Sequence, residues 1–243
     1  MLIQLINPNT SATMTDAMAT SAHQAALPTT QILASTPLHG PQSIECALDE
    51  AIASAALLDL IQAGKEQGVD AHIIACFGDP ALEAARELAD APVIGIAEAA
   101  FQLASIVAFK FGVVTTLSRT LPASEHLLYK YGYERHCSGV RATDIPVLAL
   151  EHLEPQAYAL LKRECEQAMT EDGAEAIVLG CAGMSSLVAR LQSELPVPII
   201  DGVSAAVKWA EAIHQLGIKT SKVGHFGAPV QKSYVGRYEH WTR

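Results

Sequence analysis

Two short segments with the same order of residues constrain this chain more than any other feature. In each, an apolar run ends in a cysteine, small or turn-forming residues follow, and a helical pattern comes next. The first segment contains Cys76, and the second contains Cys181, 105 residues further on. A continuous apolar run that ends near glycine and precedes a helical period is typical of a buried parallel strand. Because open α/β sheets bind ligands at the carboxyl ends of their strands, both cysteines are candidate site residues.

The rest of the chain alternates strand-like and helix-like segments in two successive series. Strands are predicted at 2–6, 31–34, 71–75, 93–96, 111–114, 138–141, 176–179 and 198–200. Helices are predicted at 13–24, 46–65, 81–88, 98–109, 123–131, 156–171, 185–195 and 204–216. This alternation favours an α/β fold with two parallel-sheet lobes that face each other across a cleft. We expect residues 1–97 plus 205–243 in the first lobe and 98–204 in the second.

Composition excludes several classes of partner and cofactor. A formal net charge of −10 without clusters of Lys and Arg argues against nucleic acid, and no apolar run is long enough to span a membrane. The first residues form a predicted strand with no export signal, so we expect a cytoplasmic protein. The five cysteines form neither a CxxC pair nor a zinc-type spacing, and no cofactor-binding motif is present. We therefore expect no metal and no cofactor.

The matched positions of Cys76 and Cys181 favour chemistry over packing. A single buried cysteine is more often a small hydrophobic residue, which is our interpretation of Cys46, Cys137 and Cys165. Two thiols across a cleft can remove a proton from one face of a carbon acid and return one to the other face. This is racemisation or epimerisation without a cofactor. Since a free thiol has a pKa of about 8.5, one thiol must have a lowered pKa or the reaction favours mildly alkaline conditions.

Five motifs together resemble the aspartate/glutamate racemase superfamily, and within it the hydantoin racemase branch. They are Leu5-Ile-Asn-Pro-Asn-Thr10, Gly40-Pro-Gln-Ser-Ile-Glu45, Ile74-Ala-Cys-Phe-Gly-Asp-Pro80, Val113-Val-Thr-Thr116 and Val178-Leu-Gly-Cys-Ala-Gly-Met184. The resemblance covers essentially the whole chain. It implies a pseudo-twofold two-lobe fold, Cys76 and Cys181 as the acid/base pair, a small-molecule substrate and a homo-oligomer.

Substrate contacts are expected around the two cysteines. Polar contacts are expected from Asn9, Thr115 and Thr116, which also suit the role of helix caps, and from Ser43, which is also a natural N-cap for the helix at 46–65. Ile44 and Phe77 are expected to pack against the ring or its substituent, with ordinary core packing as the alternative. Small residues allow backbone N–H groups to approach a ligand, and those after the cysteines are Gly78, Ala182 and Gly183.

One departure from the superfamily points to the substrate class. Amino-acid racemases of the superfamily have Thr-His after the second cysteine, whereas this chain has Ala182-Gly183. The resemblance therefore implies a neutral ring, a 5-substituted hydantoin, with allantoin racemase as the alternative that the motifs do not separate. Maleate isomerases and decarboxylase-like enzymes resemble the same superfamily, and two-lobe α/β folds also serve as small-molecule binders without catalysis, so both classes stay open.

Overall fold

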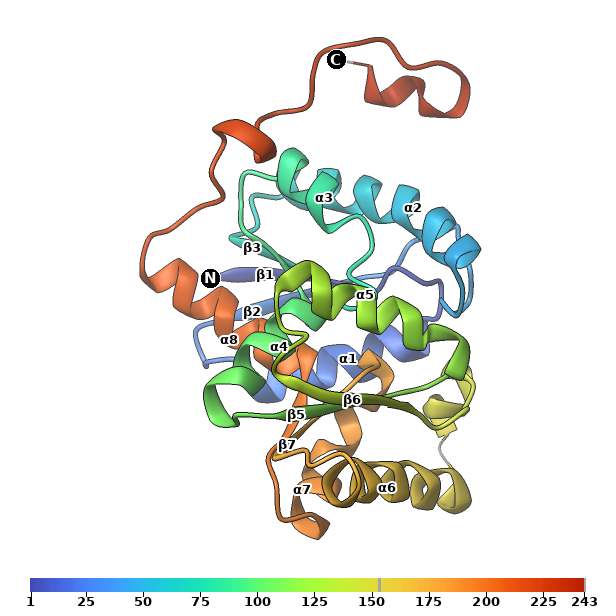
Figure 1. Cartoon of the computed structure of the whole chain (residues 1–243). Coiled ribbons are helices and arrows are strands. Elements are labelled where there is room, and N and C mark those ends of the chain that lie inside the picture. Colours follow the sequence, from blue (N-terminus) through green and yellow to red (C-terminus); the bar gives the residue numbers. More distant parts are fainter. Residues whose placement is uncertain (153, 243) are drawn as a thin grey trace.

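The computed structural model describes residues 1–152 and 154–242, which form two lobes, each built on a four-stranded parallel sheet (Figure 1). The first sheet has the order β2-β1-β3-β4, with β1 (Leu2–Ile6), β2 (Gln31–Ser35), β3 (Ala71–Ile74) and β4 (Val93–Gly95). The second has the order β6-β5-β7-β8, with β5 (Phe111–Thr115), β6 (Cys137–Ala142), β7 (Ala176–Leu179) and β8 (Ile199–Asp201). The predicted α/β fold with two parallel sheets is confirmed, and both sheets have the same strand order.

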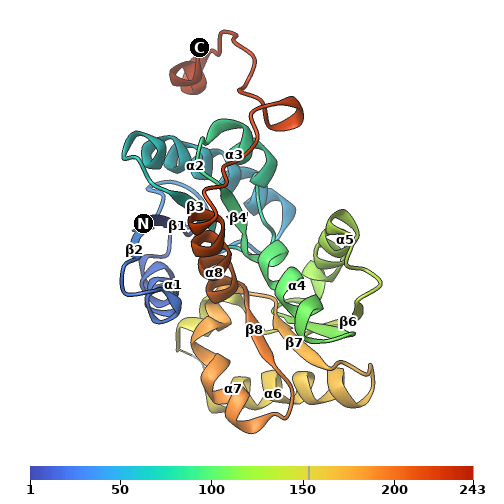
Figure 2. The ribbon, with the colours of Figure 1, turned by 90° about the vertical axis from the view of Figure 1, so that its left-hand side faces the viewer.

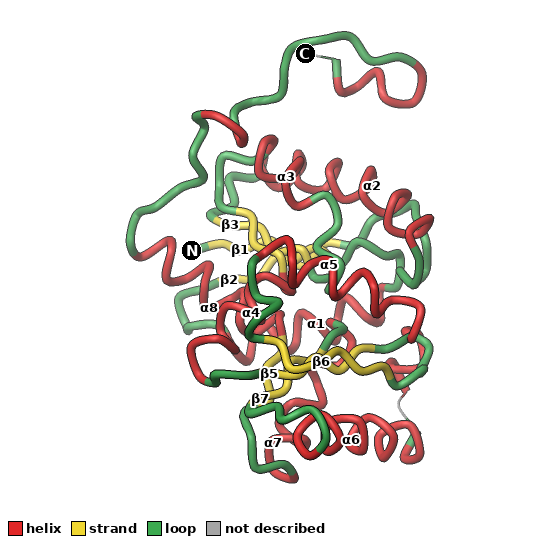
Figure 3. The backbone as a smooth tube through the Cα atoms, in the orientation of Figure 1, coloured by secondary structure: helices red, strands yellow, loops and turns green. Residues whose placement is uncertain are grey.

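Helices separate the two sheets and also cover their outer faces (Figures 1 and 3). The helices are α1 (Ala12–Ala25), α2 (Ala47–Glu66), α3 (Leu82–Leu88), α4 (Ile96–Val107), α5 (Leu121–Tyr131), α6 (Pro155–Thr170), α7 (Val188–Glu194) and α8 (Gly202–Gln215). Helices α1, α4 and α8 lie between the sheets, whereas α2 and α3 cover the outside of the first sheet and α6 and α7 the outside of the second. None of the described helices is long and apolar enough to cross a membrane.

Alternate strand residues divide the core into three clusters. Ile3 and Leu5 on β1, with Val113 on β5, belong to a central cluster that spans both sheets and the helices between them. Ile6 on β1 faces α2 and α3, and Val114 on β5 faces α6 and α7. Successive residues of a strand point to opposite faces, so a sheet with helices on both faces needs apolar residues on both. In β1 and β3 the exceptions are Gln4 and His72, which are buried and hydrogen-bonded to each other at 2.7 Å.

Two helices link the lobes because each follows a strand of one sheet and contacts the other sheet. Helix α4 follows β4 and contacts β7 and β8, while α8 follows β8 and contacts β3 and β4 (Figure 2). The helices α4 and α8 also contact each other. This crossed packing supports a proposed division into 1–97 plus 205–243 and 98–204, which stays a prediction.

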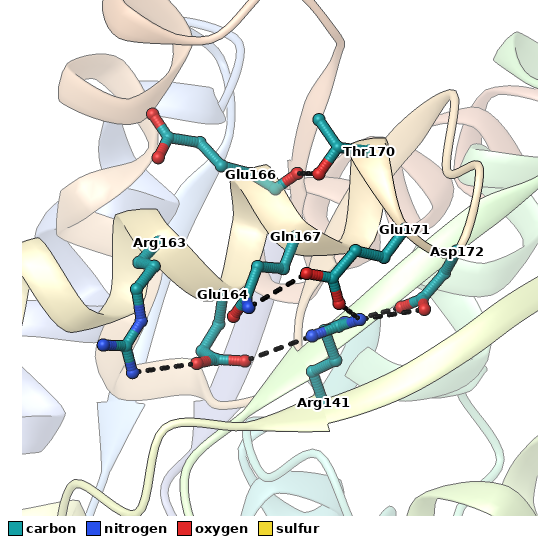
Figure 4. A network of polar contacts seen from close by, with 8 residues as sticks. All are labelled: Arg141, Arg163, Glu164, Glu166, Gln167, Thr170, Glu171 and Asp172. Carbon is teal, nitrogen blue, oxygen red and sulfur yellow. Dashed lines mark hydrogen bonds and ion pairs between the residues drawn. The ribbon is translucent and has the colours of Figure 1, made fainter.

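A cluster of charges attaches the edge strand of the second sheet to α6 (Figure 4). The Arg141 guanidinium on β6 lies 2.6 Å from Asp172 and 2.7 Å from Glu171, just beyond the end of α6, and 3.6 Å from Glu164 within it. Two of its nitrogens donate to the two carboxylate oxygens of Asp172, the bidentate arrangement that suits a planar guanidinium. This network fixes β6 beside β5, whose carboxyl end leads to Thr115 and Thr116.

Two local predictions were wrong. Ser43 does not cap α2. The N-cap is Cys46, and the Asp49 carboxylate accepts hydrogen bonds from the backbone N–H groups of Glu45 and Cys46. After Cys181 the chain forms a 3-10 helix, η3 (Ala182–Leu187), before α7 begins, so the helix predicted at 185–195 is two elements.

Candidate active site

A cavity of about 320 Å³ lies between the carboxyl ends of the two sheets. Cys76 and its neighbours line it from the loop after β3, and Cys181 with Ala182 lines it from the loop after β7. Both cysteines are free thiols. The chain thus brings together one thiol from each sheet in a single cavity.

The two cysteine loops have matching backbone geometry. The residues before the cysteines, Ala75 and Gly180, each donate a 2.8 Å hydrogen bond to a carbonyl of the neighbouring strand. The carbonyls of Cys76 and Cys181 each accept a 3.0 Å hydrogen bond from the backbone N–H three residues later. Each sulfur also accepts a hydrogen bond from the N–H two residues later, which belongs to Gly78 or Gly183. The loops are therefore equivalent under the pseudo-twofold relation between the lobes.

Burial dominates the acidity of both thiols. It raises the pKa of Cys76 to about 12 and that of Cys181 to about 11, because a thiolate loses its hydration in the cavity. The glycine N–H groups lower both pKa values and offset part of the increase. Neither thiol therefore has a lowered pKa in this structure. Of the two expectations from the sequence, this leaves a reaction that favours mildly alkaline conditions.

Two glutamates beside the thiols are functional candidates that the sequence reasoning missed. Glu45 and Glu50 line the cavity at the start of α2, and the negative charge of Glu50 raises the pKa of Cys76 while that of Glu45 raises the pKa of Cys181. A Cβ placed on Gly78 would lie 3.7 Å from a Glu50 oxygen and 3.9 Å from the Cys76 sulfur. The carboxylate and the thiol therefore converge over Gly78. Burial also raises the pKa of Glu50 itself.

Asp79 holds the first cysteine loop in place. Its buried carboxylate accepts hydrogen bonds from the backbone N–H groups of Ala97 and Glu98, both at 3.0 Å, and from the Tyr131 hydroxyl at 2.9 Å. These partners belong to α4 and α5, so Asp79 connects the loop to the second lobe. Burial raises the pKa of Asp79 to about 6 despite these donors. A Cβ on Gly95 would lie 2.3 Å from this carboxylate, so the position requires glycine.

Two of the predicted polar residues, Asn9 and Thr115, already make side-chain hydrogen bonds within the protein. The Oδ1 atom of Asn9 accepts from Asn7 at 2.8 Å and from the Ser11 N–H at 2.9 Å. Among the residues that the structure describes, the Nδ2 atom of Asn9 has only the sulfur of Met14 as an acceptor, at 3.7 Å, so this amide can still donate to a ligand. The Thr115 hydroxyl donates to the Gly180 carbonyl at 3.0 Å and joins the ends of β5 and β7.

The cavity gathers most of the residues predicted from sequence. Those that line it are Asn9, Ile44, Cys76, Phe77, Gly78, Thr115, Thr116, Cys181 and Ala182. Ser43 and Gly183 are not among the lining residues. Gly183 is packed instead, since a Cβ there would lie 3.0 Å from Leu150 and 3.2 Å from Met14.

Further lining residues were not among those predicted from the sequence, although Asn7 and Glu45 lie within quoted motifs. Besides Glu45 and Glu50 they include Asn7, Cys46, Arg119, Thr120 and Ser124. Arg119 and Thr120 come from the second lobe, opposite the start of α2. Among the described residues, no group of three or more His, Cys, Asp or Glu side chains is placed to hold a metal ion.

A model of the family described as Asp/Glu/Hydantoin racemase matches residues 3–210. The chain belongs to this family. A hydantoin racemase from Rhizobium meliloti is 52% identical over 236 residues, which cover 97% of this chain and 98% of the relative. The family and this identity make the chain an isomerase of the racemase type.

Solved structures extend the likeness to the whole fold. An allantoin racemase from Klebsiella pneumoniae superposes with a TM-score of 0.97 at 52% identity, covering 99% of this chain and 98% of that one. A glutamate racemase from Francisella tularensis has a TM-score of 0.64 at 19% identity, covering 90% of this chain and 83% of that one, and shares the fold. The first of these alignments extends into the C-terminal residues beyond α8.

Proposed function

We propose that this racemase inverts C5 of 5-monosubstituted hydantoins by proton transfer between Cys76 and Cys181. The observation that supports this most is the pair of matched loops, which bring one thiol from each sheet to one cavity. The relative named hydantoin racemase, at 52% identity, supports the substrate class.

In the proposed reaction, one thiolate takes the C5 proton and becomes a thiol. The electron pair left at C5 delocalises onto the adjacent carbonyl oxygen, which gives an enolate. The opposite thiol then protonates C5 on the other face and becomes the thiolate. Atoms and charge balance, and the enzyme is left with the thiolate on the other cysteine, ready for the reverse direction.

Allantoin is the second candidate substrate, because the solved allantoin racemase is also 52% identical and has a TM-score of 0.97. The cavity contains both apolar and polar groups that can meet a 5-substituent: Met14, Met18, Ile44, Phe77 and Val147 on one hand, and Glu50, Arg119, Thr120 and Ser124 on the other. The polar set suits a ureido group, whereas the apolar set suits aliphatic and aromatic groups.

The substrate test is polarimetry on a panel of enantiopure 5-substituted hydantoins together with allantoin. Loss of optical rotation with alkyl or aryl hydantoins at rates above that with allantoin supports the first candidate, and the opposite order supports the second. Stable rotation with every member of the panel would contradict the proposed function and favour a non-catalytic binder.

The mechanism is tested by Cys76→Ser and Cys181→Ser in deuterated water. Each variant should lose racemisation, because a full cycle needs a base and an acid, and a hydroxyl is a very weak base at neutral pH. Each should still exchange the C5 hydrogen of one enantiomer, a different one for each variant, with retention of configuration. NMR on the separated enantiomers measures this exchange. Near-normal racemisation by either variant would refute the two-thiol mechanism.

We also propose that the enzyme works in the cytoplasm as a homo-oligomer. The five unpaired cysteines fit a reducing compartment. Sedimentation velocity tests the association of copies, and fractionation of the source cells tests the location.

A further inference from the structure

The chain beyond α8 forms an arm, which we define as residues 217–242. It contains no strand and no α-helix, only two short 3-10 helices, η4 (Gly224–Phe226) and η5 (Gly236–Trp241). Figures 1 and 2 show that it leaves the end of α8, passes α3 and ends beyond the outer face of the first lobe. Because the arm has little regular secondary structure, its position depends on its contacts with the rest of the protein.

Polar contacts attach the arm to α2 and α3 at a few points. The Lys222 ammonium donates to the carbonyls of Arg86 and Glu87 at 2.7 and 3.0 Å. Near the other end of the arm, a ring nitrogen of His240 lies 2.9 Å from the Asp59 carboxylate. The arm therefore has a defined course along the outside of the first lobe.

Between these points the arm and the lobe are incompletely packed. A cavity of about 450 Å³ separates Pro229, Val230 and Tyr234 of the arm from Leu58 and Leu88 of the lobe. Protein interiors are close-packed, and voids of this size are rare within a finished core. The arm thus spans the surface of its own lobe without completing an interface there.

The arm covers only part of one face of α2, and the uncovered part is apolar. Leu48, Ile52, Ala55 and Asp59 lie at intervals of three and four residues, so they share one face of the helix. Ala55 lines the cavity under the arm, and Asp59 contacts His240. Leu48 and Ile52, in the first two turns, remain 68% and 50% exposed.

The arm itself also carries exposed apolar side chains. Val230 and Val235 are 80% and 84% exposed, although each is a large hydrophobic side chain. Together with Leu48 and Ile52 they place four exposed apolar side chains on the arm and on the helix beside it. Leu48 and Ile52 are one turn apart on α2 and so form a continuous exposed apolar surface, the kind of surface that binds other proteins.

The charge of the arm is opposite to that of the rest of the chain. Residues 217–242 contain four Lys and Arg and one Glu and so carry +3, whereas residues 1–216 carry −14; Arg243 brings the total to −10. Lys232 and Arg237 lie beside aromatic rings of the arm, at 5.8 Å from Tyr234 and 4.8 Å from Tyr238. A basic arm is attracted to a strongly acidic body, and a second copy of this chain supplies such a body.

We propose that the arm docks on a second copy of this chain, with Val230 and Val235 covering the exposed Leu48 and Ile52 of that copy. The contact is reciprocal, because a twofold axis pairs the same two patches on both subunits. It builds on the homo-oligomer proposed above and does not depend on the substrate. The exposed residues of α2 supply the apolar surface, and the opposite charges of arm and body favour a second copy over any other occupant.

The test is sedimentation equilibrium of the full chain and three variants. Val230→Asp/Val235→Asp and Leu48→Asp should each raise the dissociation constant at least tenfold, since they remove opposite sides of one contact. Ile106→Asp, at a side chain on α4 that is 65% exposed, is the matched control and should leave the dissociation constant unchanged. Melting temperatures within a few degrees of the wild type establish that the variants fold, and Lys232→Glu, which should weaken association less steeply, repeats the test with an exposed charge.

Three outcomes would overturn the docking contact. The wild-type chain could stay monomeric at all concentrations, or the arm variants could associate like the wild type. In the third outcome the basic arm binds heparin, a polyanion that stands for an acidic partner of another kind, while the copies of the chain remain separate. Racemase activity is measured independently. An active monomer would contradict the docking contact alone, while an inactive protein that associates through the arm would contradict only the proposed function.

Discussion

Replacing Glu50 by Gln should lower the pKa of Cys76 by about one unit. The carboxylate oxygen and the sulfur lie within 3.7 and 3.9 Å of one point, the position of a Cβ on Gly78. They are therefore at most about 8 Å apart, where two unit charges interact by about 2 kcal/mol at an effective dielectric constant of 20 and by about 0.5 kcal/mol in water. Since Glu50 is only half-buried, we expect a value between these limits, equivalent to about 0.4 to 1.5 pKa units.

The assay is the pH dependence of alkylation of Cys76 by iodoacetamide, a neutral reagent, with the modified peptide quantified by mass spectrometry. Because the thiolate is the reactive form, a decrease of one unit in pKa raises the alkylation rate below the pKa about tenfold. Cys181 is an internal control, since Glu45 and not Glu50 raises its pKa. Glu66→Gln is the matched variant, because Glu66 lies sixteen residues further along α2, about 24 Å away.

An unchanged Cys76 profile in Glu50→Gln, or an equal shift at Cys181, would refute the electrostatic pairing of Glu50 with Cys76. The measurement needs no substrate, so it tests the arrangement of the site independently of the reaction. A shift at Cys76 alone would assign Glu50 the role of a positioning residue that keeps this thiol protonated at neutral pH.

Three further predictions concern the site and its support. The kcat/KM for racemisation should rise with pH well above neutrality, because burial raises the pKa of Cys76 to about 12 and of Cys181 to about 11; a plateau already at pH 7 would contradict this. Asp79 titrates near 6 when folded and near 3.9 when unfolded, so the folded state binds more protons between these values and stability falls by about 3 kcal/mol as pH rises through them. Urea unfolding should show this loss in the wild type relative to Asp79→Asn, and a pH-independent difference would count against it. Phe77→Ala should change the preference among aromatic, aliphatic and ureido substituents, measured by polarimetry, and should cost about 3–5 kcal/mol through the lost contact with Phe101; an equal loss of activity across all substituents would favour a purely packing role.

Much of the fold was predictable because each element carries its own local signal. The strands Leu2–Ile6, apolar except for Gln4, and Ala176–Leu179, apolar throughout, have the predicted length, and their bounds agree with the structure. Cys76 and Cys181 were predictable for the same reason, since each follows directly on such a run. These signals depend on neighbouring residues in the sequence and not on distant contacts.

The supporting side chains were not predictable in this way. In the sequence, Glu50 resembles any acidic residue in the first turn of a helix. It acts on Cys76 only because the fold places the loop with Gly78 next to the start of α2. Asp79 looks like a turn residue before Pro80, yet its partners are the start of α4 and Tyr131, 52 positions away. The exclusion of Ser43 and Gly183 from the cavity lining likewise depends on packing between distant segments.

The two cysteine loops match in backbone geometry, but the charges around them are not symmetric. Both glutamates that raise the thiol pKa values come from one segment of the first lobe, Glu45 just before α2 and Glu50 within it. The two faces of a bound ring therefore meet different electrostatic surroundings. Mirror-image substrates have equal free energies in water, so the equilibrium constant between them is one and the kcat/KM values of the two directions must be equal. An unequal pair of environments can change only how each kcat/KM divides into kcat and KM. The enzyme is thus free to bind one enantiomer more tightly, provided that it turns that enantiomer over more slowly by the same factor.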